Sequence, residues 1–253
     1  MKYLKELQSK KVFTLSDVAA LTGNINTAKS LMRSYKKSGY VASIKKNYYA
    51  ALDLVSGNAI ANRYEIGTGA TGTAYITHHS AMEFHGVANQ VFFEVTICTT
   101  EKMRGFEFGE ITYISTKTHF ADGVVVPPRN PLIRVTNIER TVIDCIKDIE
   151  SAGGLEEVLE CIRLIPQLDE NLLLYYLSCY DQKSLWQRAG FILEKYQELF
   201  GFTGAFFDRC KNEMGIRKNY LSEGNDIAYN PEWKLYAPKD LQNFLSEGDD
   251  VFV

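Results

Sequence analysis

Three short helical patterns followed by an alternating segment fill the first 52 residues, and this order constrains the fold more than any other feature of the chain. The first pattern covers residues 2–9. The second begins after Thr14, which can cap a helix, and Asp17 follows at a position favourable to the helix dipole. Gly23 is a natural stop for this second pattern. We therefore expect two short helices in this stretch.

A third helical pattern runs to about Ser38 and has two contrasting faces, and Asn24 or Asn26 can cap its start. Apolar residues recur at helical spacing on one face, which is predicted to pack in a core: Ala28, Leu31, Met32 and Tyr35. Successive helical residues are about 100° apart, so the opposite face is polar and basic. Its stripe consists of Asn26, Ser30, Arg33 and Lys37, flanked by Thr27, Lys29 and Ser34.

Residues 39–52 have the pattern of a β-hairpin. Residues 39–44 alternate like a strand, the next three form a turn, and the chain returns from Tyr48. Helices followed by a basic hairpin are typical of a winged helix-turn-helix, whose recognition helix reads DNA. A module of this fold that binds protein is the alternative. We predict a winged helix-turn-helix over residues 1–52 that contacts DNA through Asn26, Thr27, Lys29, Ser30, Arg33, Ser34, Lys37, Lys45, Lys46, Asn47 and Tyr48.

The charge of the chain is divided unevenly between this module and the rest. Residues 1–50 hold nine lysines and one arginine against Glu6 and Asp17, a formal charge of +8. The remaining residues carry −11, since the whole chain has a net charge of −3. Lysine and arginine side chains placed at phosphates release condensed counterions, so a basic head on an acidic body favours a polyanion as the partner. We therefore expect the partner to be double-stranded DNA.

Residues 53–72 are expected to be a linker. Residues 67–72 match the G-x-G-x-x-G pattern, which in dinucleotide-binding folds follows a strand and opens a helix. Here the preceding residues 60–64 have a helical pattern and the following residues 73–77 have a strand pattern. This reversed context favours a flexible joint over a nucleotide site, and we expect no cofactor.

Residues 73–253 are expected to form a larger domain of mixed strands and helices, so the predicted fold class is α+β. Strand-like segments within residues 73–137 are rich in β-branched and aromatic residues and surround one short helix, at 80–85: they are 73–77, 91–99, 105–115 and 132–136. Four helical patterns follow within residues 138–200: 138–148, 155–165, 170–179 and 184–200. Residues 201–253 are left without an assignment.

Histidines and cysteines offer no spacing that is typical of a metal site. His78 and His79 are adjacent at the end of a strand pattern, and adjacent strand residues point to opposite faces. Neither they nor His85 are accompanied by cysteines or carboxylates at ligand spacing. The five cysteines contain no C-x-x-C pair, which predicts reduced and mostly buried thiols. We expect no bound metal.

Catalytic motifs are also missing from the sequence. No G-x-S-x-G, Walker A loop or paired-carboxylate signature occurs, so we do not expect an enzyme. Arg140 opens a helical pattern and Asp144 follows one turn later, which predicts a structural charge pair. The alternative is a nucleic-acid-processing enzyme that uses acidic residues of the strand region: Glu94, Glu107, Glu110 and Asp122.

Segments that would direct the chain to a membrane are not evident. No stretch approaches 18 uncharged apolar residues, the usual requirement for a spanning helix. The N-terminal residues lack the apolar run and the small-residue cleavage site of a signal peptide. We therefore expect a cytoplasmic protein that does not associate with membranes.

Several short motifs together resemble one known family. They lie within about residues 10–200 and comprise residues 13–19 (FTLSDVA), 79–86 (HSAMEFHG), 139–145 (ERTVIDC), 153–157 (GGLEE) and 187–194 (QRAGFILE). In this order they resemble the AbiEi family of antitoxins. The resemblance implies the antitoxin of a type IV toxin-antitoxin pair, whose toxin is a nucleotidyltransferase. It also implies that the N-terminal domain represses the operon by binding inverted repeats in its promoter, and that the larger domain opposes the toxin without a stable complex.

Overall fold

The computed structural model describes residues 2–117, 120–221, 227–239 and 241. Helices and strands are both abundant and occur largely in separate stretches, so the α+β class is confirmed. The chain divides into two compact units. The first comprises Met1–Ile76, Phe92–His119 and Val124–Val135, and the second comprises Thr77–Val91, Phe120–Gly123 and Thr136–Val253.

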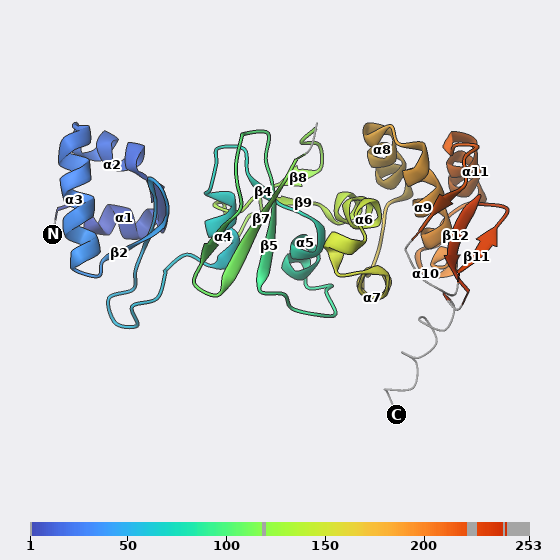
Figure 1. Cartoon of the computed structure of the whole chain (residues 1–253), viewed down its shortest axis with the longest axis horizontal. Helices are drawn as coiled ribbons and strands as arrows, with labels where there is room; N and C mark the ends of the chain where they lie inside the picture. Colours follow the sequence, from blue (N-terminus) through green and yellow to red (C-terminus); the bar gives the residue numbers. More distant parts are fainter. Residues whose placement is uncertain (1, 118–119, 222–226, 240, 242–253) are drawn as a thin grey trace, which may run out of the picture. The chain divides into compact units, whose positions relative to one another are not determined.

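Three helices and a three-stranded sheet form the N-terminal part of the first unit (Figure 1). The elements are α1 (Leu4–Lys10), β1 (Val12–Thr14), α2 (Leu15–Thr22), α3 (Ile25–Lys37), β2 (Val41–Lys45) and β3 (Tyr48–Ala51). The hairpin of β2 and β3 confirms the expected turn, while β1 was not expected and pairs antiparallel with β3. The sheet therefore has the order β1-β3-β2.

Local capping explains where α2 and α3 begin. The Thr14 side chain accepts a hydrogen bond from the backbone of Asp17, whose carboxylate accepts one in return from the backbone of Thr14. Gly23 ends α2 in the left-handed conformation with φ of 73°. The side chain of Asn24, rather than Asn26, caps α3. These contacts place α2 and α3 in tight succession.

One apolar core holds the N-terminal elements together. Ala28, Met32 and Tyr35 of α3 are buried as expected, and Leu31 is partly buried against them. Buried residues of the other elements complete the core: Leu4, Leu7, Phe13, Leu15, Val18, Val41 and Ala51. Because this side of α3 is enclosed, its polar side faces solvent.

The segment expected to be a flexible linker contains a buried helix, α4 (Arg63–Thr68). Asn62 and Glu65 form a capping box at its start. Glu65 is buried, and its carboxylate accepts hydrogen bonds from Lys11 at 2.5 Å and from Asn130 at 2.8 Å. Part of residues 53–72 is therefore packed structure, because a buried carboxylate needs such partners.

Two glycines at the C-terminal end of α4 serve packing. The helix-before-strand order is confirmed, since α4 precedes β4 (Tyr75–Ile76). A Cβ atom at Gly69 would lie 2.4 Å from the Tyr48 hydroxyl oxygen, so only glycine fits there. Gly67 is buried, and a Cβ at that position would lie 3.0 Å from Ile76. These glycines permit close approach of neighbouring chain segments.

A six-stranded mixed sheet follows in the order β6-β7-β5-β4-β9-β8. Besides β4 it comprises β5 (Glu94–Cys98), β6 (Phe106–Phe108), β7 (Ile111–Thr116), β8 (Val124–Val125) and β9 (Val135–Thr136). The pairs β5–β7 and β4–β9 are parallel, whereas β4–β5 and β6–β7 are antiparallel. All four strand-like segments of the sequence contribute to this sheet.

The second unit is mainly helical and ends in a small sheet. Its helices are α5 (His78–His85), α6 (Ile138–Lys147), a 3-10 turn (Glu150–Ala152), α7 (Leu155–Arg163), α8 (Glu170–Tyr180), α9 (Lys183–Glu194), α10 (Gln197–Phe200) and α11 (Gly204–Glu213). The strands β10 (Asn219–Tyr220), β11 (Ile227–Asn230) and β12 (Leu235–Pro238) follow. Their order is β10-β12-β11, so the unassigned C-terminal segment contributes a helix and a sheet.

Candidate nucleic-acid interface

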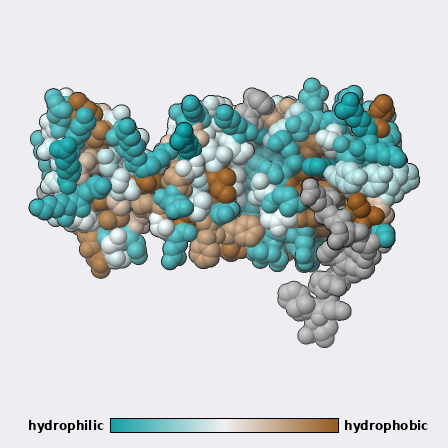
Figure 2. All heavy atoms as spheres, in the orientation of Figure 1, coloured by the Kyte–Doolittle hydropathy of each residue, from teal (hydrophilic) through white to brown (hydrophobic). Residues whose placement is uncertain are grey.

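The polar stripe of α3 faces solvent. Every predicted contact residue on this helix is exposed: Asn26, Thr27, Lys29, Ser30, Arg33, Ser34 and Lys37. Figure 2 shows mostly hydrophilic residues over the region where Figure 1 places α3. The helix contains no acidic residue that would repel a phosphate. It therefore presents hydrogen-bonding and cationic groups that can contact base edges and backbone phosphates.

Cations of this stripe are not engaged by carboxylates. Within the described part of the chain, no acidic side chain forms an ion pair with Lys29, Arg33 or Lys37. Lys10 and Lys11 differ, because they pair with Asp17 at 2.7 Å and with Glu65 at 2.5 Å. The positive charge of the first 50 residues thus consists of structural cations and of cations open to a ligand. The second kind includes Lys29, Arg33 and Lys37 on α3.

Two residues of the hairpin turn extend the polar surface. Lys46 and Asn47 are exposed, and Asn47 adopts φ of 62°, a conformation that asparagine tolerates in turns. The backbone N–H of Leu15 donates to the carbonyl of Asn47 at 2.9 Å, which ties the turn to the start of α2. Lys46, like the stripe residues of α3, has no ion-pair partner among the described residues.

Tyr48 does not belong to this surface. Its side chain is 3% exposed, and its hydroxyl donates to the carbonyl of Ile66 at 2.8 Å. Burial raises its pKa, so the phenol stays protonated and serves as a donor in the core. The prediction of Tyr48 as a contact residue is corrected on this ground. In the sequence, an aromatic residue directly after a basic turn looks like a residue that could contact DNA. Its position in the strand decides that its side chain points into the core.

Lys45 is less exposed than Lys46 and less buried than Tyr48. It is partly buried, and its ammonium lies 4.8 Å from the centre of the Phe106 ring and 5.8 Å from that of Tyr48. Burial lowers its pKa, while the charge of Glu101 acts in the opposite direction. Contacts within the first unit therefore hold this side chain, which leaves Lys46 as the exposed cation of the turn.

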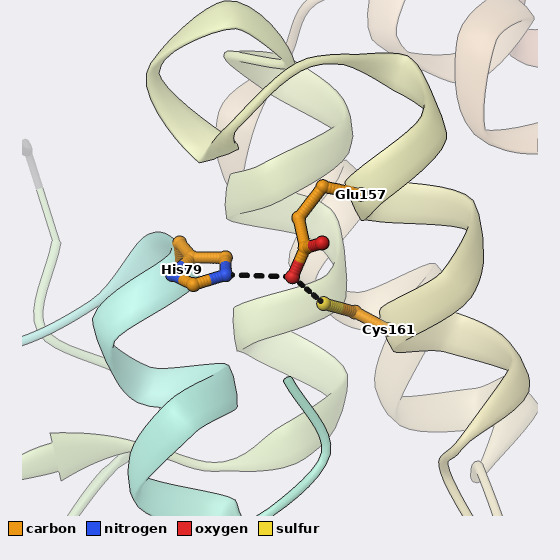
Figure 3. A group of neighbouring side chains, drawn as sticks. All are labelled: His79, Glu157 and Cys161. Carbon is orange, nitrogen blue, oxygen red and sulfur yellow. Dashed lines mark hydrogen bonds and ion pairs between the residues drawn. The ribbon is translucent and has the colours of Figure 1, made fainter. Parts of the chain in front are cut away.

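A second polar cluster lies buried in the second unit, where α5 and α7 meet (Figure 3). His79 Nε2 donates to Glu157 Oε1 at 2.8 Å, and the Cys161 thiol contacts the same oxygen at 3.2 Å. The backbone N–H groups of Asn89 and Gln90 also donate to this oxygen, at 3.1 and 3.0 Å. One carboxylate oxygen thus joins two helices and the loop that follows α5.

The three side chains of this cluster are of types that bind metals. Nitrogen, carboxylate and sulfur atoms of His79, Glu157 and Cys161 lie within 4.8 Å of one another, and these are ligand types that Zn²⁺ uses. However, Glu157 Oε1 already accepts four donors, and burial raises the pKa of the Cys161 thiol to about 12. The arrangement is explained as an anchor that fixes the loop of Asn89 and Gln90.

The sequence did not predict this anchor. His78 and His79 were expected at the end of a strand, with their side chains on opposite faces, but both lie in the first turn of α5 and are buried. Glu157 is 78 residues from His79 along the chain. No local spacing signals a pair that is separated so widely, so only the packing of α5 against its neighbours reveals it.

The structure places the four carboxylates considered for catalysis at separate positions. Glu94, Glu107 and Glu110 are exposed on or beside β5 and β6. Asp122 accepts a hydrogen bond from the Tyr175 hydroxyl at 2.7 Å. Among the residues that the structure describes, none of these four acids belongs to a group of three side chains close enough to share a metal ion.

Two further predictions concern the cysteines and the membrane-spanning potential of the helices. All five cysteines are free, and four are buried, as the scattered spacing predicted. None of the helices in the described residues has the length and apolar character needed to cross a lipid bilayer.

Comparisons with known proteins reveal a similar fold but no family. No family model matches the chain, and no curated protein matches it. Among solved structures, the α+β fold recurs over nearly the whole chain in the RV2827C protein from Mycobacterium tuberculosis. The TM-score is 0.66, the sequences are 15% identical, and the match covers 98% of this chain and 94% of that chain. The similarity establishes a shared fold.

Proposed function

We propose that this protein is a DNA-binding transcriptional repressor whose N-terminal domain is a winged helix-turn-helix. In this assignment α2 and α3 form the helix-turn-helix, α3 is the recognition helix, and the hairpin of β2 and β3 is the wing. The observation that carries the proposal is the exposed stripe of α3, on which Lys29, Arg33 and Lys37 have no ion-pair partner in the described residues. Cations left unpaired on a rigid helix suit the phosphates and base edges of duplex DNA.

The revised contact set follows from the exposure of each side chain. It retains the predicted α3 residues and, in the turn, Lys46 and Asn47. Lys45 is expected to contribute little, because its ammonium lies over the Phe106 ring. Tyr48 is left out because it is buried.

The regulatory context is proposed from the family resemblance. The protein would bind inverted repeats in its own promoter and repress its operon. It would also act as the antitoxin of a type IV toxin-antitoxin pair, with the second unit opposing a nucleotidyltransferase toxin without a stable complex. A repressor of this kind works in the cytoplasm. We assign no toxin-contacting residue, because the resemblance implies no interface.

The test is binding of the full-length protein to its own upstream DNA against a scrambled duplex, at two salt concentrations. We expect tighter, salt-sensitive binding to the upstream DNA. The double substitution R33A/K37A should weaken binding and reduce the slope of log affinity against log salt by about 1 for each phosphate that is no longer neutralised. R163A/R209A removes the same charge from surface ion pairs elsewhere and is the matched control.

Each outcome decides between functions. Weaker binding by R33A/K37A, with the control unchanged, supports the recognition-helix assignment. Equal binding to both duplexes, or none, would overturn it and favour a protein-interaction module. For the antitoxin role, co-expression should rescue growth from a nucleotidyltransferase toxin encoded beside this gene, and failure to rescue would reject that role while leaving DNA binding intact.

A further inference from the structure

Three side chains that can bind a metal ion converge between α5 and α7. Figure 3 shows His79 of α5 facing Glu157 and Cys161 of α7. Glu157 and Cys161 are four residues apart, so about one turn of helix brings them to the same face of α7. One ligand atom from each of the three side chains lies within 4.8 Å of the other two. The packing of two helices thus gathers a nitrogen, an oxygen and a sulfur atom.

The distances between these atoms are close to those around a bound ion. Zn²⁺ holds nitrogen and oxygen ligands at about 2.0 to 2.2 Å and sulfur at about 2.3 Å, so the ligand atoms of a tetrahedral site lie roughly 3.3 to 3.6 Å apart. Here Glu157 Oε1 lies 2.8 Å from His79 Nε2 and 3.2 Å from Cys161 Sγ. Separating these atoms by roughly half an ångström would admit the ion. The second carboxylate oxygen of Glu157 can supply a fourth donor atom.

The four hydrogen bonds to Glu157 Oε1 are compatible with a cation. Two come from the backbone of Asn89 and Gln90, and the other two come from His79 Nε2 and the Cys161 thiol. A divalent cation replaces the protons of this second pair, which pass to solvent, because metal-bound imidazole and thiolate carry none there. Coordination removes the thiol proton even where burial raises the pKa of Cys161. Two protons leave as two positive charges arrive, so the cluster keeps its net charge.

Glu83 provides the further contact that metal-binding histidines usually make. His79 Nδ1 lies 3.3 Å from Glu83 Oε1, whereas Nε2 faces Glu157. A proton held on Nδ1 by this carboxylate leaves Nε2 as the nitrogen that can bind a cation. The side chains of Glu83 and Glu157 are 5% and 1% exposed, so water competes little for these contacts. The orientation of the imidazole is therefore set before any ion binds.

We propose that His79, Glu157 and Cys161 form a Zn²⁺ site in the second unit. Imidazole and thiolate ligands favour Zn²⁺ over Mg²⁺ and Ca²⁺, which prefer oxygen ligands. All three side chains are buried, which suits an ion that joins α5 to α7 and holds the loop of Asn89 and Gln90. Sequence spacing could not predict the site, because His79 and Glu157 are 78 residues apart. Titration of His79 is a property of the metal-free protein, where protons make the same contacts.

The test uses full-length protein that has been treated with a chelator and is then titrated with Zn²⁺ or, separately, with Co²⁺. We expect one Zn²⁺ per chain in competition with a chromophoric chelator, and a denaturation midpoint that rises with the Zn²⁺ concentration. Co²⁺ should give a sulfur-to-metal charge-transfer band, because Cys161 binds as the thiolate. Absence of this band in the wild-type protein would overturn the proposal without the need for any variant.

Substitutions identify the side chains that hold the ion. C161S should abolish the charge-transfer band and the stabilisation by Zn²⁺. C179S removes a free cysteine that is partly exposed and should behave like wild type. E83Q keeps all three ligands, so the band should remain while the affinity for Zn²⁺ falls by about 10- to 100-fold. Melting curves of the metal-free variants check folding. Zn²⁺ binding that survives C161S and is lost in C179S would overturn the proposal, since the ion would then sit on an accessible thiol.

Discussion

Arg140 and Asp144 lie one turn apart on α6, where the guanidinium Nε donates to the carboxylate at 2.7 Å and neither side chain is more than 2% exposed. The helical spacing predicted this pair, but not its burial. Thr77 donates to the second carboxylate oxygen at 2.6 Å, and Arg140 donates to the carbonyl of Asp122 at 2.9 Å. The ring of Phe120 lies 3.7 Å from the guanidinium carbon. Such partners compensate for removing two charges from water.

Removal of one member of this pair should destabilise the fold strongly. The substitution D144A leaves the Arg140 guanidinium buried and uncompensated, so we expect a loss of about 3 to 5 kcal/mol in the free energy of unfolding. Chemical denaturation measures this loss. The exposed pair of Arg209 and Glu213 is the control, and R209A should cost no more than about 1 kcal/mol. Equal effects of D144A and R209A would show that burial of the pair is unimportant.

Stability should depend on pH through His79 and Glu157. Burial lowers the pKa of His79, but hydrogen bonds and charges of Glu83 and Glu157 outweigh burial and raise it above its ordinary value of 6.5. Protonation is therefore more favourable in the folded state. The contribution of His79 to the free energy of unfolding is complete below about pH 6.5. It is lost as the pH rises through the raised pKa of His79.

The pKa of Glu157 changes in the opposite direction. Burial alone would raise it, but hydrogen bonds from His79, Gln90 and Cys161 hold it below its ordinary value of 4.5. The contribution of Glu157 to the free energy of unfolding is present above that value and is lost as the pH falls through the lowered pKa.

Unfolding free energies of wild type and H79Q, measured from about pH 6.5 upward, should converge as the pH rises. A constant difference between the two proteins would refute the charge pair.

Tyr48 should affect stability and leave DNA binding unchanged. The substitution Y48F removes the hydrogen bond to the buried carbonyl of Ile66, and we expect a cost of about 1 to 3 kcal/mol. K46A is the complementary variant, since Lys46 is exposed in the turn. It should weaken promoter binding without changing the denaturation midpoint. A reduced promoter affinity for folded Y48F would return this tyrosine to the contact set.

Gly190 should tolerate no larger residue, although it lies within α9. A Cβ atom there would lie 2.1 Å from the ring of Trp233, whose indole N–H donates to Glu194 at 2.8 Å. We expect G190A to cost about 1 to 3 kcal/mol through overpacking, despite the higher helix propensity of alanine. In G204A the new methyl group meets nothing within 4 Å, so this variant should be neutral or slightly stabilising. Thermal unfolding of both variants measures the difference.

Local sequence patterns predicted the features that depend on residues close together in the chain. The capping contacts of Thr14 and Asp17 and the Arg140–Asp144 pair each lie within about one helical turn, and the exposed stripe of α3 lies within a single helix. In these cases the helical repeat fixes which side chains meet or share a face, wherever the helix packs. The α+β class followed from the order of such patterns.

Other features depend on contacts between distant segments, and local patterns did not predict them. A strand over β1 was missed because its three residues gain their hydrogen bonds from β3. The packed helix α4 was taken for part of a linker, although the partners of Glu65 are Lys11 and Asn130. The C-terminal sheet pairs β12 with both β10 and β11, which the pattern of no single strand can indicate.

The sequence by itself therefore determined the fold class, the two ends of α2 and the exposed basic face of α3. Tertiary structure decided which of the predicted contact residues reach solvent, since strand register turns Tyr48 into the core while Lys46 remains outside. It also brought His79 to Glu157 across 78 residues. The physical reason is that a buried polar group must find its partner wherever packing supplies one, and that partner has no fixed distance along the chain.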